Sequence, residues 1–422
     1  MNRPADPRLR IPAPTTAGAA LLLVLAACAP GTGTHDVVDH QTGERTSWLV
    51  DPTPRVSVGV VSGDEAYELG EISAGAVRSD GGILLADNRT KTLRRYDADG
   101  VFVSEWGGEG LGPGEFLSPT QLVLGADDAV TVWDAGIWRA TRYDADGRLL
   151  GVSTFRRDDL IGLVEPDLAP LTAFILAGGG YLIPMLEKEG MASGGKGGGT
   201  RAKPGRAEAG EVLTRQRVAV VRVTADVAGP EPVAELGWDE QVEVAAPWGP
   251  LRLAPPLGRR PVFAVQPNAS NFCVGDQSEA SVACFNAAGS QRTVAWNATP
   301  TPVTRDDPEI DVWRKEMADL LGQKLGPGVI EAVLGQVPLP TIRPPYGRLI
   351  LDRRGNLWVE QGPADHGAST AYLVFDEDGG EVALALLPQG RVLEIDDHRV
   401  LLVQSDELGV QFVHLYSLEK AR

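Results

Sequence analysis

The chain has 422 residues, of which 57 are acidic and 39 are basic, so its formal net charge at pH 7 is −18. This acidic balance disfavours binding to nucleic acid, because phosphate contacts need clustered Lys and Arg side chains. It equally disfavours docking of a folded surface onto anionic lipid.

The first 27 residues have the pattern of a signal peptide. Arg3, Arg8 and Arg10 form a basic region, and the apolar run over residues 17–27 is too short to span a bilayer comfortably as a helix. The run ends in LAAC, residues 25–28, which resembles the lipobox of bacterial lipoproteins. This resemblance implies cleavage before Cys28 and acylation of that residue. The alternative is an ordinary signal peptide followed by a chance cysteine.

We therefore expect an exported protein that is lipid-anchored to the bacterial cell envelope and faces the periplasm or the cell exterior. Residues 28–54 are polar with little periodicity, which is typical of a flexible tether. Residues 1–27 carry a net charge of +2, so their removal leaves about −20. The lipid on Cys28, and not the folded surface, would hold such a protein at the membrane.

Two sequence markers occur in order six times between residues 55 and 420. The first is a polar turn followed by a β-rich run, as in SDGGILLAD, residues 79–87. The second is a β-rich run that enters a tight turn, as in RYDADG, which appears at residues 95–100 and again at 142–147. Short runs of Val, Leu, Ile and aromatic residues bounded by Gly, Asp or Asn are typical of strands joined by tight turns.

Four antiparallel strands every 40–50 residues, roughly, are the pattern of a β-propeller, in which radial packing lets each unit cover its neighbours. We predict an all-β fold: a six-bladed β-propeller of four-stranded antiparallel blades. The last unit has only three strands, so we predict that residues 55–61 supply its fourth strand and close the ring. The predicted blades are approximately residues 73–106, 117–155, 165–238, 262–297, 346–388 and 390–419.

The stretch ADNRTKTLRRYDADGVFVSEWGGEGLGPGEF, residues 86–116, resembles the NHL-type six-bladed propellers found among bacterial lipoproteins. The link GGEGLGPGEF, residues 107–116, is especially similar. The resemblance covers residues 55–420 and is strongest over the first two blades. It implies a fold and not an activity, because propellers of this type include lyases, lactonases, sugar-binding proteins and scaffolds.

Three insertions interrupt the repeat, at residues 187–216, 239–260 and 305–336. The first lies between the second and third strands of a blade, and the others link consecutive blades. Such segments all fall on one end of a propeller, so we predict that this loop-rich end is the binding face; neutral growth of loops is the alternative.

The third insertion is predicted to contain a helix, at about residues 306–335. Asp307 is expected to cap its N-terminus, with Pro308 at the first helical position. Whether the helix packs on the propeller or covers a ligand is left open. Its predicted apolar face consists of Ile310, Trp313, Met317, Leu320 and Leu321.

Cys273 and Cys284 flank a ten-residue segment and are predicted to lie on adjacent strands of the fourth blade. Their positions are symmetric about the hairpin, and an exported protein retains disulfides. We predict a disulfide between them; two buried thiols are the alternative.

Catalytic motifs are scarce: the sequence has no HExxH, no paired CxxC and no GxSxG. Candidate ligand contacts come from the loops between second and third strands. They are Asp87, Asn88, Arg89, Trp133, Asp134, Trp138, Asp276, Gln277, Glu360, His366, Gln404 and Asp406.

Carboxylates recur at this position in four blades and could hold Ca²⁺ or another divalent cation, as in the calcium-dependent lactonase propellers. We favour the alternative that they accept hydrogen bonds from turn amides. Trp133 and Trp138 could form a stacking shelf for a sugar or peptide, although such residues more often pack between blades.

We expect a monomeric binding or scaffold module that recognises a protein, peptide or glycan through its loop-rich end, with no cofactor. The alternative is a lyase or lactonase that uses a divalent cation in the central channel. A third interpretation is a structural subunit of an envelope complex.

Replacement of Cys28 tests the anchor. If Cys28 is acylated, Cys28→Ala should move the protein from the membrane fraction to the soluble fraction, because the lipid is the only attachment expected. Fractionation followed by immunoblotting measures the change. Retention of the variant in the membrane fraction would rule out the lipobox interpretation.

Overall fold

The computed structural model describes residues 46–156, 167–188, 211–212, 215–224, 229–286, 289–322, 325–362 and 369–420. The predictions for Cys28, for His366 and for most of the insertion at 187–216 concern residues outside these ranges. Within the ranges, no helix is long and apolar enough to cross a membrane.

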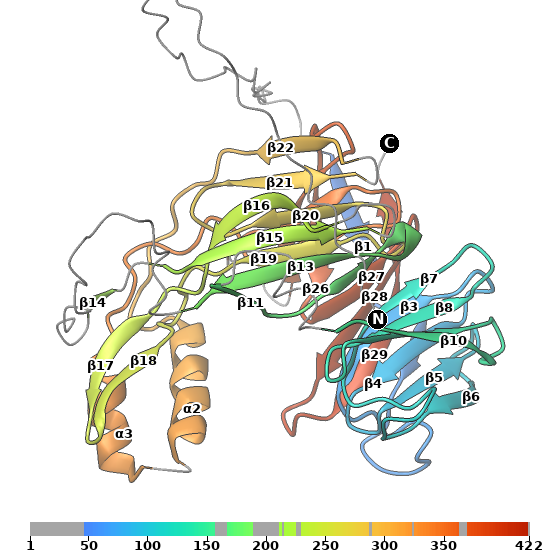
Figure 1. Ribbon diagram of the computed structural model, residues 1–422, viewed down its shortest axis with the longest axis horizontal. Coiled ribbons are helices and arrows are strands. Elements are labelled where there is room, and N and C mark those ends of the chain that lie inside the picture. Colours follow the sequence, from blue (N-terminus) through green and yellow to red (C-terminus); the bar gives the residue numbers. More distant parts are fainter. Residues whose placement is uncertain are drawn as a thin grey trace, which may run out of the picture. The chain divides into compact units, whose positions relative to one another are not determined.

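The fold is all-β with few helices, and its sheets have a propeller-like arrangement, as predicted (Figure 1). The first two complete sheets are meanders in which each strand pairs with the next one in the chain. The strands are β3 (Ile72–Val77), β4 (Ile83–Asp87), β5 (Thr92–Tyr96) and β6 (Phe102–Gly107), then β7 (Pro119–Leu124), β8 (Val130–Asp134), β9 (Arg139–Tyr143) and β10 (Leu149–Thr154).

The following two sheets keep this order, except that β11 and β12 both pair with β13 and the 3₁₀ turn η1 (Ala177–Gly179) joins β12 to β13. The strands are β11 (Leu168–Pro170), β12 (Phe174–Leu176), β13 (Gly180–Glu187), β15 (Arg217–Val223) and β16 (Glu231–Gly237), then β19 (Val262–Val265), β20 (Phe272–Gly275), β21 (Ser281–Phe285) and β22 (Gln291–Ala295).

The last strands form one nine-stranded sheet, because β1 (Ser47–Val50) joins two groups by pairing parallel to β26 and antiparallel to β29. The first group is β23 (Leu349–Leu351), β24 (Leu357–Glu360), β25 (Ser369–Phe375) and β26 (Glu381–Pro388). The second is β27 (Arg391–Ile395), β28 (Arg399–Ser405) and β29 (Gln411–Lys420), with β2 (Val56–Val58) on its edge.

The N-terminal strand β2 pairs with the C-terminal strand β29, as predicted for residues 55–61. Val56 lies opposite Leu415, and Val58 lies opposite Val413. This pairing supplies hydrogen bonds to an edge of β29 that would otherwise be exposed.

Strand β1 corrects the prediction that all of residues 28–54 form a tether, since residues 47–50 belong to a sheet. Trp48 is the cause: its side chain is buried, with its ring 5.4 Å from that of Trp358 and the Lys420 ammonium 4.5 Å above it. The favourable burial of an aromatic ring of this size explains why the segment is ordered.

Apolar side chains fill the space between each sheet and the next. In the second strand of each sheet, alternate residues point to opposite faces, so one strand contributes to two apolar clusters. This explains why these strands are almost wholly apolar. Followed around the molecule, the clusters return to the first sheet. Representative pairs are Leu84 with Val132, Trp133 with Ile183, Leu182 with Phe272, Val282 with Leu357, Trp358 with Val400, and Leu401 with Ile83.

The repeated YDADG segment links each of the first two complete sheets to the chain segment that precedes that sheet. The hydroxyl of Tyr96 donates to the carbonyl of Ala66, and that of Tyr143 donates to Gly114. Each segment ends in a tight turn, where Gly100 has a φ of 82°, a conformation that favours glycine. The recurrence in the sequence thus reflects one structural role used twice.

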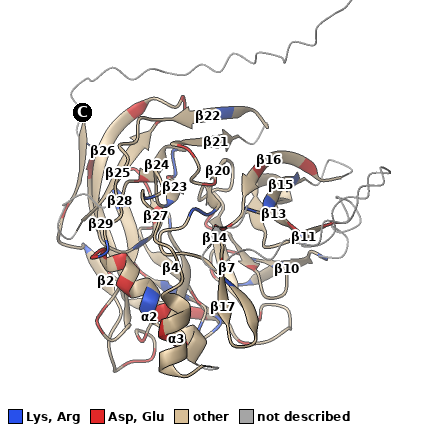
Figure 2. Cartoon of the chain, turned by 90° about the vertical axis from the view of Figure 1, so that its left-hand side faces the viewer, with Lys and Arg blue, Asp and Glu red and all other residues tan. Residues whose placement is uncertain are grey.

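Two insertions fold together into a small unit, the hairpin–helix platform, formed by residues 242–253 and 308–334. It consists of β17 (Val242–Ala246), β18 (Gly249–Leu253), α2 (Pro308–Gly322) and α3 (Pro327–Leu334), with β14 (Glu211–Val212) paired to β17. The insertion predicted as one helix therefore contains two, which lie side by side (Figure 2). The platform has its own buried core, which includes Val244, Leu253, Leu321, Ile330 and Val333.

Helix α2 begins as predicted, because Oδ1 of Asp307 accepts a hydrogen bond from the amide of Glu309. Its predicted apolar face is wrong at one position. Leu320 is 60% exposed, whereas Leu321 packs in the platform core. Successive residues of a helix are rotated by roughly 100°, so the two leucines cannot both face the hairpin.

The predicted disulfide is confirmed. Cys273 on β20 lies directly opposite Cys284 on β21, and their sulfur atoms are bonded. Both residues are buried in the cluster between their own sheet and β23–β26.

Ring closure by β2 can be tested with two valines of the same segment. Val58 is fully buried between β29 and the first sheet, whereas Val61 is 58% exposed. Val58→Ala should lower the free energy of unfolding by roughly 1–3 kcal/mol through lost apolar burial. Val61→Ala should change it by less than about 0.5 kcal/mol. Denaturation curves measure both, and equal effects would contradict the placement of β2.

Candidate functional site

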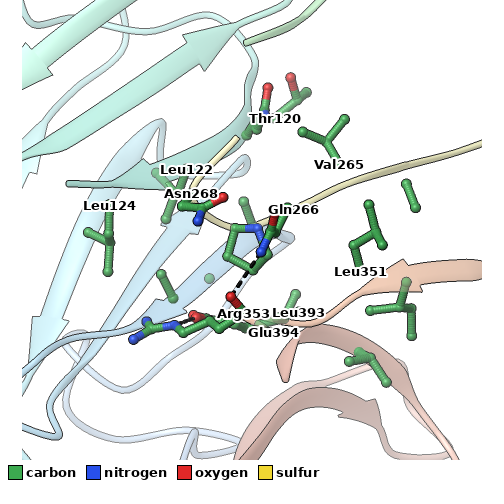
Figure 3. Close-up of a pocket in the computed structure, with 18 of the residues that line it drawn as sticks. Thr120, Leu122, Leu124, Val265, Gln266, Asn268, Leu351, Arg353, Leu393 and Glu394 are labelled. Carbon is green, nitrogen blue, oxygen red and sulfur yellow. Dashed lines mark hydrogen bonds and ion pairs between the residues drawn. The ribbon is translucent and has the colours of Figure 1, made fainter. Parts of the chain in front are cut away.

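The innermost strands of the sheets enclose a central channel with a cavity of about 520 Å³. Its walls come from β3, β7, β19, β23 and β27 and from the residues that follow these strands. The lining mixes apolar side chains such as Leu122 and Leu393 with polar and charged ones such as Gln266, Arg353 and Glu394 (Figure 3). This volume lies within the range of small-molecule sites in proteins, roughly 300–1,000 Å³.

Hydrogen bonds join neighbouring sheets around the channel, most of them through a side chain. Gln121 and the backbone of Ile175 bond reciprocally, with the amide of Ile175 2.7 Å from Oε1. The amide of Ala177 donates to the carbonyl of Ala269. Further contacts are Gln266 to Arg353, Arg353 to Glu394, Val77 to Glu394, and Ser79 to Asp128.

Glu394 and Arg353 form an ion pair at the channel wall. Oε2 of Glu394 also accepts from the amide of Val77 at 2.7 Å, so both carboxylate oxygens have partners. Burial raises the pKa of Glu394, although the charge of Arg353 and the hydrogen bonds oppose this effect. The carboxylate of Glu394 therefore serves to join Arg353 and Val77 at the channel wall.

Arg391 lies at the start of β27, where its guanidinium donates to the carbonyls of Ile72 and Ser73. Burial lowers the pKa of Arg391, with a smaller contribution from the positive charge of Arg348. Oε1 of Gln411 accepts from the amide of Ile72 at 2.7 Å. These contacts tie the last strands to the first sheet at the loop-rich end of the channel.

Five predicted ligand contacts, including Asp406, are carboxylates that accept hydrogen bonds from backbone amides. Asp87 accepts from the amides of Gly70, Glu71 and Arg89, and Asp134 accepts in the same way from the segment that enters its own sheet. Asp276 accepts from the amide of Gly237, and Glu360 accepts from the amide of Arg348. This is the structural role favoured from the sequence.

The other predicted polar residues also have partners within the protein. The side chain of Gln277 bonds to the backbone of Arg260, Tyr346 and Gly347. Asn88 accepts from Lys91, Arg89 donates its amide to Asp87, Gln404 donates to the carbonyl of Gln389, and Asp406 accepts from the amides of Leu408 and Val410.

Trp133 and Trp138 are buried and do not form an exposed shelf. Their rings lie 5.9 Å apart, and Trp133 also lies 5.3 Å from Tyr181 of the neighbouring sheet. The exposed fractions are 0% for Trp133 and 6% for Trp138. These residues pack between sheets, which is the alternative to a stacking shelf and the more common role of such residues.

None of the described residues predicted to contact a ligand lines the central cavity. Of the predicted residues that the structure describes, Gln404 alone lines a second cavity, of about 560 Å³, together with Arg391 and Gln411. The candidate residues chosen from the sequence lie at the ends of the second strands, whereas the cavity is lined by the innermost strands. A signal was present: Glu394 interrupts the apolar pattern of β27, and Gln266 directly follows the apolar strand β19. A polar side chain at such a position must face the channel or a partner.

A metal site of three or more ligands is absent from the described part of the chain, where no such group of His, Cys, Asp or Glu comes together. The carboxylates considered as calcium ligands instead accept hydrogen bonds from backbone amides.

The hairpin–helix platform exposes large apolar side chains. Trp248 at the hairpin tip and Val312 on α2 are each 56% exposed, and Leu320 on α2 is 60% exposed. The charged side chains of α2 are of both signs (Figure 2). The platform lies in links between sheets, which run at the loop-rich end.

Comparison with known proteins gives only distant likenesses. No family model and no curated protein matches the sequence. Among solved structures, a member of the DUF4221 family from Bacteroides vulgatus is 9% identical, with a TM-score of 0.47 over 90% of this chain and 100% of that one.

Regucalcin, a calcium-binding protein from Agrobacterium tumefaciens, is 11% identical, with a TM-score of 0.36 over 89% and 97% of the two chains. Virginiamycin B lyase from Staphylococcus aureus is 10% identical, with a TM-score of 0.39 over 89% and 100%. These likenesses are too distant to bear on activity.

The role of Asp87 can be tested by its pH dependence. Burial alone would raise the pKa of Asp87, but the backbone hydrogen bonds and the charge of Arg94 outweigh it and hold the pKa below the ordinary value of 3.8. The ionised carboxylate therefore stabilises the fold above that value, and its contribution is lost as the pH falls through the lowered pKa.

Asp87→Asn should lower the free energy of unfolding by about 1–3 kcal/mol at pH 7, because an amide cannot replace both acceptor oxygens. The deficit should shrink near pH 3. Asp99→Asn, at an exposed turn, should have little effect at either pH. Urea denaturation at both pH values is the measurement, and a deficit independent of pH would contradict this role.

Proposed function

We propose that the chain is a lipid-anchored, NHL-type six-bladed propeller of the bacterial cell envelope. It acts as a binding module for a protein or peptide through its loop-rich end. The proposal of six blades is supported by the apolar clusters that follow one another from sheet to sheet and return to the first. In this interpretation β1 lies between the fifth and sixth blades, and β2 completes the sixth.

One observation carries the proposal for binding. Two insertions on either side of the β19–β22 sheet fold against each other into a platform with its own core, held by Trp313, whose indole donates to the carbonyl of Ala254, and by Gln336 bonded to Ala245. Loops that are rigidly supported in this way and that expose apolar side chains are typical of interaction sites.

A protein or peptide is the partner that the platform favours over a glycan. Val312 and Leu320 are aliphatic, and their exposed surface gains little from contact with hydroxyl-rich sugars. An exposed Trp248 is the type of residue that dominates protein interfaces energetically. We propose that the protein does not bind nucleic acid and that it is a monomer when its partner is not bound.

Export and anchoring belong to the same proposal. The lipobox-like sequence before Cys28 and the disulfide between Cys273 and Cys284 both fit an oxidising compartment outside the cytoplasm. An acyl chain on Cys28 would hold the propeller near the membrane, where an envelope partner would be encountered.

The enzymatic alternative receives less support. A lyase or lactonase of the metal-dependent type needs several carboxylate or imidazole ligands around one point. Among the residues that the structure describes, the carboxylates recurring at the strand ends are bound to backbone amides, and Glu394 in the channel is bound to Arg353 and Val77.

Site-specific photo-crosslinking tests the proposal. A benzophenone amino acid in place of Trp248 should give a discrete, protease-sensitive adduct in cells. The same probe in place of Val101, an exposed residue in a turn at the opposite end of the sheets, should not. Identical adducts at both positions, or none at Trp248, would contradict the proposal, and an adduct resistant to protease would indicate a glycan instead.

A further inference from the structure

Arg391 presents unused hydrogen-bond donors at the loop-rich end of the channel. Its exposed side chain lines both the central cavity and the second cavity. A guanidinium has five N–H donors. The described residues accept from one on Nη1 and one on Nη2, through the carbonyls of Ser73 and Ile72, and from none on Nε. Arg391 can therefore bind a further acceptor without giving up these structural contacts.

The positive charge of Arg391 has no close counter-charge. No carboxylate of the described residues forms an ion pair with it, whereas Arg353 in the same channel pairs with Glu394 (Figure 3). The surrounding protein lowers the pKa of Arg391, and the positive charge of Arg348 lowers it further, while the negative charge of Glu71 opposes both effects. A cation that is partly desolvated and unpaired is unfavourable, and a bound anion would relieve this.

Gln411 supplies a second donor to the same cavity. Its Oε1 accepts from the amide of Ile72 at 2.7 Å, and this bond fixes the orientation of the side chain, because turning it would set two N–H donors against each other. Nε2 of Gln411 is therefore the open end, and it donates to none of the described residues. The amide and the carbonyl of one strand residue point to the same side. Ile72 thus holds Gln411 and Arg391 next to each other.

The second cavity offers donors and no acidic side chain. None of the described residues that line it is Asp or Glu. Gln404 has its Nε2 occupied, since it donates to the carbonyl of Gln389 at 2.6 Å. The exposed hydroxyl of Ser405 adds a further donor. This composition is the opposite of a cation site and is complementary to an anion.

A carboxylate matches these groups better than a phosphate does. Arg391 is the one cation among the described residues that line the second cavity, so it neutralises one negative charge, whereas a phosphate monoester carries nearly two at pH 7. The planar guanidinium also matches the two oxygens of a carboxylate. Apolar side chains of the central cavity, such as Leu122 and Leu393, can contact the organic body of the molecule.

We propose that the loop-rich end of the channel binds a small organic carboxylate whose oxygens accept hydrogen bonds from Arg391 and from Nε2 of Gln411. Both donors are already held by Ile72, so little ordering is needed when the ligand binds. This small-molecule site is distinct from the platform proposed to bind a protein, and neither proposal depends on the other.

The test compares 3-phenylpropionate with 3-phenylpropionamide, which has the same shape but no charge, on the purified full chain. Ligand-observed NMR titration at low ionic strength gives both dissociation constants. The carboxylate should bind roughly tenfold more tightly than the amide, because hydrogen bonds to an ionised acceptor are the stronger ones. Phenyl phosphate is the third probe and should bind no more tightly than the carboxylate. In a crystal structure of the complex, the carboxylate should lie within hydrogen-bond distance of Arg391 and Gln411.

Three variants isolate the site. Gln411→Glu keeps an acceptor for the amide of Ile72 but replaces the open donor by a negative charge beside Arg391, so the preference for the carboxylate probe should disappear. Gln291→Glu makes the same change at an exposed position of β22 and should keep the preference. Arg391→Gln removes the cation and should also abolish the preference. Thermal unfolding verifies that each variant folds.

Arg391 also bonds the first sheet, so Arg391→Gln can fail to fold. Gln411→Glu and the crystal structure of the unaltered protein then decide the matter. Four results would overturn the proposal. They are binding of neither 3-phenylpropionate nor its amide, equal binding of the two by the unaltered protein, an unchanged preference in Gln411→Glu, and a carboxylate that lies away from Arg391 in the crystal. Tighter binding of phenyl phosphate would overturn the assignment to a carboxylate.

Discussion

The structure depends on the hydrogen bonds that connect each innermost strand to the next around the channel. Sheets packed only through apolar faces can slide, because the hydrophobic effect has no direction. Bonds such as Ile175 to Gln121 and Val77 to Glu394 fix the height of one sheet against its neighbour. The cavity keeps its shape because these bonds set the positions of its walls.

These hydrogen bonds around the channel also explain why strands from both ends of the described chain pair with each other. Arg391 and Glu394 of β27 bind the backbone of β3, so the last strands must lie beside the first sheet. β2 then pairs with β29, and β1 inserts between β29 and β26. The edges of β26 and β29 would otherwise be open to another chain, and these pairings cover them. The six-bladed ring proposed here is the simplest closed arrangement of these contacts.

Much of the fold follows from the sequence because it is repetitive. The spacing of YDADG, the apolar second strands and the symmetric cysteines all reflect local periodicity and turn chemistry, which sequence patterns express directly. The pairing of residues 55–61 with the last strands could be predicted because the final repeat unit has only three strands. Strand β1 could not be found in this way, since its order comes from contacts with residues far apart in the chain, such as that of Trp48 with Trp358.

The candidate site was much less accessible from the sequence. Asp87 and Asp134 carry the residue type of ligand contacts, but their partners are backbone amides of the segments that enter their own sheets. Conversely, Gln266 directly follows the apolar strand β19, and only the structure brings it to the carbonyl of Arg353. A side chain's availability for a ligand depends on which tertiary partners it already has.

Native-state hydrogen exchange tests the central claim, that polar bonds between innermost strands close the sheets into one cooperative ring. The amides of Val77 and Ile175, each bonded to a side chain of a neighbouring sheet, are the reporters. In a closed ring both should exchange only through global unfolding, with the same free energy and the same response to denaturant. Exchange of Val77 through a separate, smaller opening, while Ile175 stays protected, would contradict the account.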